Sequence, residues 1–341
     1  MSLILGVDIG YQTVKLIGLE KSGKLWRLRG MSVVSIPSNP WQADKIIHQE
    51  EIAKAIQDGL RQAKPHPIHS RYAMTALPES VIFSATFAAD KLPEKEMAEN
   101  LPFEIAEKLA INLEEYQIDY EALKTRCQPT ETEAAGSAAK TAGKGAPTVA
   151  KGAITKQTIF AVAAKGSLIE SLIELHRKAK LELAGIDIKP GAIARSVIEK
   201  DDGQARVIID MGVGGTGVSV TEGQNLRVTA TVPWGTNILG SDVTKTSPAD
   251  LTGKAAPVFD ELSHVIRFFE SRVCPALRIK EIIISGTGAS IPNIKDIFAK
   301  ESGLTVRLAE PFGRVHTGDF PVPELLSHSF ADVVGLAMRR P

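Results

Sequence analysis

Short apolar runs separated by polar turns open this sequence, a pattern typical of a β-meander. Three strands are expected, at residues 2–7, 14–19 and 25–34. Residues 46–60 then carry apolar side chains at helical spacing, and Pro65 ends that segment. A strand at 71–77 should follow. The chain therefore begins as the first part of an α/β lobe.

The pattern changes between Val81 and Ala164, where the expected order is strand, helix, strand at 117–123 and strand at 158–163. This order predicts a small α+β subdomain inserted into the first lobe. Residues 127–153 interrupt it with many Ala, Gly and Thr residues and no aromatic side chain. Because such a segment buries too little apolar surface to offset the entropy of ordering it, we expect a mobile loop.

The meander pattern returns in the second half, at residues 206–232. Further elements are expected as helices at 166–179, 192–199, 260–273, 293–301 and 325–339 and a strand at 280–285. The second half therefore repeats the strand-rich opening of the first.

Composition and charge narrow the class of protein. Forty basic residues balance forty acidic ones, so no global field would hold nucleic acid. No uncharged run of about 18 apolar residues occurs, and the start lacks the basic region of a signal peptide. Cys127 and Cys274 are far apart in the sequence without metal-type spacing, which fits a reducing compartment better than an oxidising one. A cytoplasmic protein is expected.

One pattern occurs twice. Leu3–Leu19 and Val207–Val220 each consist of an apolar strand, then Asp-x-Gly, then a second apolar strand. Asp8 and Asp210 hold the same place in the two copies. A single Asp-x-Gly is usually an ordinary turn, but a duplication at long spacing predicts two similar lobes that face each other across a cleft.

Glycine-rich hairpins at this place can bind phosphate, because backbone N–H groups point into one space with no Cβ in the way. The glycines concerned are Gly10 in the first copy and Gly212, Gly214, Gly215 and Gly217 in the second. Asp8 and Asp210 would face a Mg²⁺ ion held mainly by phosphate oxygens and water. Thr13 and Thr216 would add hydroxyl donors, and Lys15 would add a positive charge.

The glycine-rich segments of the second half were also compared with other known nucleotide-binding motifs. Gly212, Gly214 and Gly217 satisfy the dinucleotide pattern G-x-G-x-x-G, but that fingerprint requires a helix next, and residues 218–223 read as strand and turn. The P-loop pattern does not occur in the sequence. A third glycine-rich turn, at 282–290, would let a flat base lie against the backbone, or would simply allow close strand–helix packing.

The order Asp-x-Gly, Asp-x-Gly, Ser-Gly-x-Gly resembles the phosphate 1, phosphate 2 and adenosine motifs of the actin-like ATPase superfamily. Within it, the chain resembles the PilM family of type IV pilus assembly, a relative of the division protein FtsA. Further matching residues lie at 6–10, 14–16, 76–79, 104–106, 118–123, 160–165, 232–237 and 311–315. The resemblance covers nearly the whole chain.

The resemblance implies an α/β, actin-like (ribonuclease H-like duplicated) bilobed fold, with a small inserted α+β subdomain in lobe 1 like subdomain 1C of FtsA. The expected parts are lobe 1 at 1–70 and 166–204, the inserted subdomain at 71–165, lobe 2 at 205–322 with a reduced helical subdomain around 241–275, and a C-terminal helix at 323–341 that returns to lobe 1.

The same resemblance implies that the cleft binds ATP and Mg²⁺. The residues implied to hold the nucleotide are Gly10, Tyr11, Gln12, Thr13, Lys15, Gly212, Gly214, Gly215, Thr216, Gly235, Asn237, Gly286, Thr287, Gly288 and Ser290. Asp8 and Asp210 would face the metal through water. Three residues depart from the family pattern, since Tyr11 and Gln12 would crowd the γ-phosphate and Thr236 replaces a customary Gly.

An adaptor is the function that the resemblance implies. It would receive the cytoplasmic N-terminal peptide of a PilN-like bitopic membrane protein in a groove of the first lobe, with other pilus platform proteins as further partners. Through that partner it would lie at the cytoplasmic face of the inner membrane, with no membrane insertion of its own. ATP binding is expected more than efficient hydrolysis, because no residue stands out as the base or water-orienting group.

Two alternatives stay open. A degenerate scaffold of the same fold, in a pilus or a type II secretion system, would no longer bind nucleotide. A small-molecule kinase of the superfamily would need an acceptor pocket with an Asp base, for which Asp44, Asp90 and Asp119 are the candidates.

Overall fold

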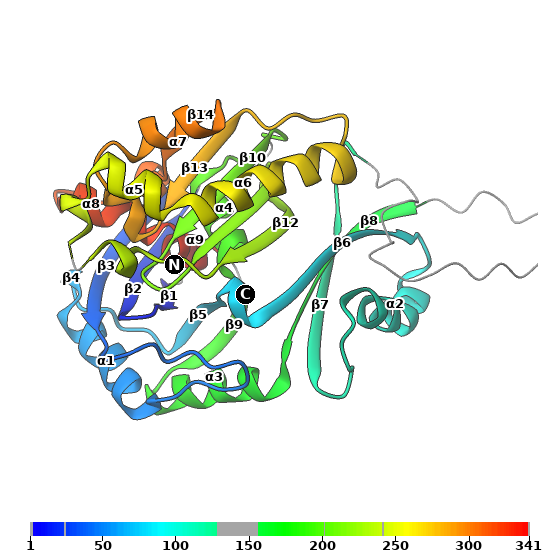
Figure 1. The fold of residues 1–341 in the computed structure, drawn as a ribbon. Helices are drawn as coiled ribbons and strands as arrows, with labels where there is room; N and C mark the ends of the chain where they lie inside the picture. Colours follow the sequence, from blue (N-terminus) through cyan, green and yellow to red (C-terminus); the bar gives the residue numbers. More distant parts are fainter. Residues whose placement is uncertain (1–2, 24, 128–155, 201, 241, 340–341) are drawn as a thin grey trace, which may run out of the picture.

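The computed structural model describes residues 3–23, 25–127, 156–200, 202–240 and 242–339. Two mixed sheets form the body of the molecule, and a smaller sheet with one helix projects from one side of it (Figure 1). Apart from Cys127, the segment 127–153 that we expected to be a mobile loop lies outside the described residues.

The first sheet begins with the predicted meander and has the strand order β15-β3-β2-β1-β5-β9, with β4 paired to β3. Its strands are β1 (Leu3–Ile9), β2 (Thr13–Ser22), β3 (Leu25–Ser35), β4 (Lys64–Pro65), β5 (Tyr72–Leu77), β9 (Glu182–Ile188) and β15 (Val315–His316). β1 runs antiparallel to β2 and parallel to β5. The apolar faces of α1 (Gln49–Gln62) and α3 (Gly166–Lys178) bury Leu5, Val7 and Ile9 of β1.

The inserted subdomain is present. β6 (Ile82–Asp90), β8 (Lys156–Lys165) and β7 (Tyr116–Leu123) form an antiparallel sheet in that order, and α2 (Glu94–Leu109) packs on it through Leu101 and Ile105. Its expected start at residue 71 is corrected to the end of β5, because residues 72–77 pair with β1 and β9 in the first sheet.

The second sheet repeats the arrangement of the first. Its strand order is β12-β11-β10-β13-β14, and β10 runs antiparallel to β11 and parallel to β13, as β1 does with β2 and β5. The elements of this half are β10 (Ala205–Met211), β11 (Thr216–Glu222), β12 (Asn225–Val232), α5 (Pro248–Lys254), α6 (Ala256–Phe268), a π-helix (Phe269–Val273), β13 (Glu281–Ser285), α7 (Ile294–Ser302) and β14 (Thr305–Leu308). The predicted duplication is therefore confirmed.

Two helices connect the halves. α9 (Ala331–Met338), which follows the short α8 (Glu324–Ser327), packs on β1, β2 and β5, while α4 (Lys189–Val197) contacts both β9 and β10. Gly335 lets these two helices approach closely, because a Cβ there would lie 1.8 Å from the carbonyl oxygen of Ala192. The α4–α9 pair is thus a shared layer between the sheets.

The two cysteines form a disulfide, although 147 positions separate Cys127 from Cys274 in the sequence. The sequence analysis did not predict this bond, because the two cysteines are far apart along the chain. The fold brings the end of the β7 segment onto lobe 2 and so brings the two sulfur atoms together.

Candidate functional site

The hairpins after β1 and β10 converge on one cavity of about 190 Å³. The predicted residues that line it are Asp8, Gly10, Tyr11, Thr13, Lys15, Asp210, Gly212, Gly214, Gly215, Thr216, Gly286 and Thr287. They come from the β1-β2 hairpin, the β10-β11 hairpin and the turn after β13. The structure thus brings the two acid-glycine hairpins together.

Other predicted residues do not line this cavity: Gln12, Gly235, Asn237, Gly288 and Ser290. Gly235 packs behind the second hairpin, where a Cβ would lie 2.1 Å from the carbonyl oxygen of Val213. Asn237 donates its backbone N–H to the same oxygen at 3.1 Å. Gly288 packs on Met211, with 2.4 Å from an added Cβ to the Met211 Cβ. The structure gives these residues supporting contacts behind the cavity.

Backbone hydrogen bonds close both hairpins. Gly10 donates to the carbonyl oxygen of Thr13 at 2.8 Å, and Gly212 donates to that of Gly215 at 3.0 Å. Thr216, which we expected to be a hydroxyl donor, gives its proton to the Trp234 carbonyl at 2.8 Å. Its hydroxyl proton is therefore not available to an anion in this arrangement.

The third glycine-rich turn lies against the second acid. Gly286 has a φ of 80°, a left-handed conformation that favours glycine, and a Cβ there would lie 2.8 Å from Asp210 Oδ1. The hydroxyl of Ser285 donates to the same Asp210 oxygen at 2.8 Å. The turn after β13 therefore orients the Asp210 carboxylate.

Tyr11 fills space between the two hairpins. A Cβ added to Gly214 would lie 2.0 Å from the Tyr11 ring, so the ring from lobe 1 packs directly on the glycine backbone of lobe 2. The side chain is 36% exposed and lines the cavity. Small-molecule sites usually enclose ~300–1,000 Å³, so the cavity in this arrangement is too small for a whole nucleotide. A bound nucleotide requires this ring to move or the lobes to separate.

Asp8 is held by two lysines. Lys189 Nζ lies 2.6 Å from its Oδ1, and Lys15 Nζ lies 3.2 Å from its Oδ2. Burial opposes ionisation of this carboxyl, but the ammonium groups of Lys189 and Lys15 outweigh it and hold its pKa well below the usual range. Asp8 is therefore a carboxylate whose two oxygens are already paired.

Lys189 and Asp332 were missed by the sequence analysis. Lys189 Nζ lies 3.4 Å from Asp332 Oδ2, and both residues line the cavity from the shared α4–α9 layer. Burial and the charge of Asp8 raise the pKa of Asp332 to about 6. Burial lowers the pKa of Lys189, but the charges of Asp8 and Asp332 outweigh burial, so that the pKa is raised. Neither residue belongs to a glycine motif, so only the fold reveals them.

Glu79 was also not predicted as a site residue, although it lies in the segment 76–79, which the sequence analysis gave as resembling the PilM family. Its Oε1 is buried and has no hydrogen-bond partner among the described residues. A Cβ added to Gly217 would lie 2.4 Å from this oxygen, which places the carboxyl of lobe 1 against the second hairpin. Burial, and then the charge of Asp210, raises the pKa of Glu79 to about 7.

The donor set decides where a magnesium ion fits. Asp8 Oδ2 accepts from Lys15, and Asp8 Oδ1 lies 2.6 Å from Lys189 Nζ, so a metal ion would compete with two ammonium groups for this carboxylate. Asp210 and Glu79 fit a metal-facing role better, because they supply carboxylate oxygens from opposite lobes and Glu79 Oε1 has no hydrogen-bond partner among the described residues. Within the described ranges, no cluster of three or more His, Cys, Asp or Glu side chains could bind a metal by itself.

The kinase alternative finds no acceptor base in this cavity. Of the described residues that line it, the acidic ones are Asp8, Glu79, Asp210 and Asp332, and the candidates Asp44, Asp90 and Asp119 are not among them. Asp90 pairs with Lys156 at 2.7 Å on the inserted subdomain. Asp119 lines the larger cavity that is described next, and not the one between the two hairpins.

A second, larger cavity of about 1090 Å³ lies between the inserted subdomain and the two lobes. We call it the groove. It is lined by residues 117–126, by Phe160 and 162–164 of β8, by 186–188 of β9, by Gly191 and Arg195 of α4, and by 222–226 of lobe 2. Since consecutive residues of β7 all line it, the groove follows the edge of that strand and not only one face.

Two strand edges border the groove. Among the described residues, β7 pairs only with β8 and β9 pairs only with β5, so each has one edge without a strand partner. Leu123, Phe160 and Leu226 form an apolar cluster at its wall. At its end, Asp187 pairs with Arg195 at 2.8 Å and with Arg339 at 2.9 Å.

Comparison with known proteins agrees with this architecture. The sequence model of the family described as type IV pilus assembly protein PilM matches residues 6–142. The resemblance to the PilM family is thereby confirmed. The matched segment contains the first hairpin, Glu79 and the β6-α2-β7 part of the inserted subdomain, so family and geometry agree on these elements.

Solved structures extend the likeness in fold to the whole chain. A PilM–PilN type IV pilus biogenesis complex matches with a TM-score of 0.77 and 19% identity, covering 98% of this chain and 97% of that one. The ethanolamine utilization protein EutJ from Carboxydothermus hydrogenoformans matches with a TM-score of 0.51 and 11% identity, covering 99% and 90%. The expected actin-like fold is confirmed.

Proposed function

We propose that this protein is an adaptor of the type IV pilus assembly platform, whose groove captures the cytoplasmic N-terminal peptide of a PilN-like membrane protein. The observation that carries the proposal is the groove bordered by two free strand edges. An extended peptide can add a strand to such an edge, taking affinity from backbone hydrogen bonds and specificity from alternate side chains. The PilM–PilN structure of the same fold supports this choice of partner.

The groove favours a particular peptide. Its wall of Leu123, Phe160 and Leu226 suits apolar side chains at alternate positions of a strand. Asp187, which also lines the groove, has both carboxylate oxygens paired with arginines. We therefore propose an extended ligand with apolar side chains at alternate positions.

Attachment to the membrane would then come from the partner. Within the described part of the chain, no helix has both the length and the apolar character that crossing a bilayer requires. We propose that the bound peptide keeps the protein at the cytoplasmic face of the inner membrane.

The test is peptide binding by fluorescence anisotropy, with a labelled synthetic peptide of the cognate PilN-like N-terminus. Val162→Glu places a charge against the apolar cluster of the groove wall and should weaken binding about tenfold or more. The matched control is Phe103→Glu, a 67% exposed position on the same subdomain that does not line the groove, and it should bind as the wild type does. Normal affinity in folded Val162→Glu protein would remove the groove from the proposal.

The cleft between the hairpins would bind ATP, and the metal, when bound, would neutralise phosphate charge beside Asp210 and Glu79. Lys15 and Lys189 would contribute positive charge, and the turn at Gly286 and Thr287 would lie near the base. Binding can favour one lobe arrangement only through a difference in affinity between arrangements. Since the inserted subdomain contacts lobe 2 beside the groove, we propose that nucleotide modulates peptide capture.

ATP hydrolysis is a second candidate function, and Glu79 is the observation that favours it. An unpartnered carboxyl with a pKa near 7 beside the second hairpin can orient a water molecule. Purified protein should then turn over ATP, and Glu79→Gln should lower turnover by a larger factor than it lowers the affinity for Mg·ATP. A rate of about 1 s⁻¹ or more would identify an enzyme, whereas no detectable turnover would leave the adaptor function alone.

A further inference from the structure

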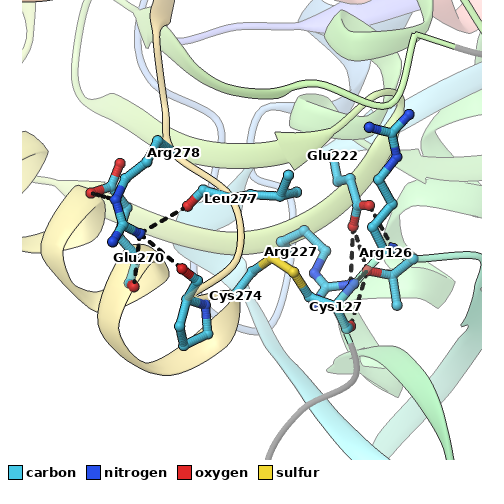
Figure 2. Close-up of a disulfide and its surroundings, with 10 residues drawn as sticks. Arg126, Cys127, Glu222, Arg227, Glu270, Cys274, Leu277 and Arg278 are labelled. Carbon is cyan, nitrogen blue, oxygen red and sulfur yellow. Dashed lines mark hydrogen bonds and ion pairs between the residues drawn. A yellow bond between two sulfur atoms is a disulfide. The ribbon is translucent and has the colours of Figure 1, made fainter.

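The disulfide joins two parts of the molecule that meet beside the groove. Cys127 follows β7 at the end of the inserted subdomain, and Cys274 follows the π-helix of lobe 2. Figure 2 shows the bond between the turn that holds Cys274 and the segment that leads to Cys127. Both cysteines are buried, with 4% and 0% of their surface exposed.

On the subdomain side, polar contacts already hold residues 124–127 on lobe 2. The Glu222 carboxylate accepts from the Arg126 backbone N–H at 2.8 Å and from the Thr125 hydroxyl, and it lies 3.5 Å from Arg227 Nη1 (Figure 2). Asn225 Nδ2 donates to the Lys124 carbonyl at 3.1 Å. We call residues 124–127 the wall segment, because Lys124, Thr125 and Arg126 line the groove.

On the lobe 2 side, Cys274 lies in a tightly bonded turn. Its N–H donates to the Phe269 carbonyl at 2.7 Å, and its carbonyl accepts from Leu277 N–H at 3.1 Å. Arg278 Nη1 donates to the Pro275 carbonyl at 3.0 Å, and Glu270 accepts from Ile279 N–H at 2.8 Å. The sulfur of Cys274 is thus fixed to the body of lobe 2.

We propose that the Cys127–Cys274 disulfide is a staple that makes the wall segment of the groove part of lobe 2. Oxidised protein then has one groove wall that follows every movement of lobe 2, whereas reduced protein retains non-covalent contacts alone, among them those of Glu222 and Asn225. The part of this inference that concerns ligand capture rests on the proposed function, and the staple itself does not.

The bond forms by thiol–disulfide exchange with a low-molecular-weight disulfide as the oxidant. One cysteine thiolate attacks the oxidant and releases a thiol, and the second thiolate displaces the remaining thiol from the mixed disulfide. The two cysteines lose two electrons and two protons in all, and the oxidant becomes two thiols. Because both sulfurs are buried in the folded protein, the wall segment must lie away from lobe 2 while this exchange takes place.

Peptide mapping of the purified full chain tests the bond without any ligand. Free thiols are blocked with iodoacetamide under denaturing conditions, and the protein is digested with trypsin without reductant. We expect peptide 127–140 to be recovered linked to peptide 273–278. Recovery of both cysteines in alkylated form, even after treatment with oxidised glutathione, would overturn the staple.

Limited proteolysis of the native protein tests what the bond holds. Trypsin cleavage after Lys124 and Arg126 should be about fivefold or more faster in the Cys127→Ser/Cys274→Ser variant and in reduced wild type than in oxidised wild type. Ser271→Ala, an exposed position near Cys274 that leaves the bond intact, is the matched control and should follow the oxidised wild type. Equal cleavage rates in oxidised and reduced wild type would overturn the role of the bond.

Peptide anisotropy separates this inference from the proposed function. Oxidised wild type should bind the PilN-like peptide about fivefold or more tightly than reduced wild type, and the double serine variant should show no dependence on redox state. Binding that is equal in both redox states would overturn the coupling of the staple to the groove. If no form binds the peptide, the proposed function fails, while peptide mapping and proteolysis still decide the staple.

Discussion

Tyr11 belongs to the first hairpin, and its ring lies on the backbone of Gly214 in the second. The contact occupies the space where the two acid-glycine hairpins face one another. A ligand that enters this cleft therefore competes with a side chain of the protein itself.

Replacing Tyr11 with Ala should open the cleft. If the Tyr11 ring lies between the hairpins in about 90% of the molecules, removing the ring should tighten nucleotide binding about tenfold. Titration calorimetry with Mg·ATP measures the change. Tyr72→Ala, at an exposed tyrosine outside the cavity, should leave affinity unchanged. Weaker binding in Tyr11→Ala would mean that the ring contacts the nucleotide instead of excluding it.

Glu79 should make stability depend on pH. Its pKa is about 7 in the folded protein against an ordinary value of 4.5, so the folded state binds one more proton than the unfolded state between these pH values. This contribution to stability is complete below about pH 4.5 and is lost as pH rises through 7. The difference in unfolding free energy, wild type minus Glu79→Gln, should fall by about 1–2 kcal/mol between pH 4.5 and 8, since part of the residue stays accessible.

Urea denaturation at both pH values measures this difference. Glu301→Gln, on the exposed side of α7, should give a difference that does not change with pH. A difference for Glu79→Gln that rises with pH would contradict the assignment of a buried, protonated carboxyl.

Sequence reasoning reached part of this site. It found Asp8 and Asp210 because a repeat marks them, and it found the glycines because a hairpin needs them. It missed Lys189 and Asp332 because their helices meet at the cavity only in the folded chain, and it gave Asp8 a metal-facing role because the pairing with Lys189 cannot be seen in a linear motif. The cysteine pairing was missed for the same reason.

Among the elements, the α4–α9 contact depends on one missing Cβ. Gly335→Ala would place a methyl group 1.8 Å from the Ala192 carbonyl oxygen, so the helices must separate. We expect a loss of about 3 kcal/mol or more in unfolding free energy, measured by urea denaturation. The matched variant Gly253→Ala in α5 meets nothing within 4 Å and should be neutral or stabilising by up to ~1 kcal/mol. A loss of similar size in both variants would contradict the packing argument.

The strands that the sequence predicted are those with strong apolar runs, such as β1, β2, β10 and β13. β9 and β14 were not predicted. β9 is an edge strand whose residues are half-buried or exposed and include Gly185, and β14 has only four residues. Their place in the sheets is decided by parallel pairing with β5 and β13, which local pattern does not contain.

At the scale of the whole molecule, a shared cleft predicts stabilisation by ligand. At about 100 times its dissociation constant, Mg·ATP should add ~2.7 kcal/mol to the unfolding free energy. Thermal-shift titration measures the effect. Asp210→Ala should remove it, and Asp296→Ala, outside the cavity on α7, should keep it. No shift at millimolar Mg·ATP would favour the degenerate scaffold.

The shared helical layer also has a consequence for biosynthesis. The face of the first sheet that α9 covers is made early, but residues 331–338 leave the ribosome only after all of lobe 2. Domains fold as units while the chain grows, so lobe 2 can complete its own core first. One apolar face of the N-terminal strands stays exposed until α9 has been synthesised. A nascent chain stalled before α9 should therefore be a client of cotranslational chaperones, and release of α9 should end that dependence.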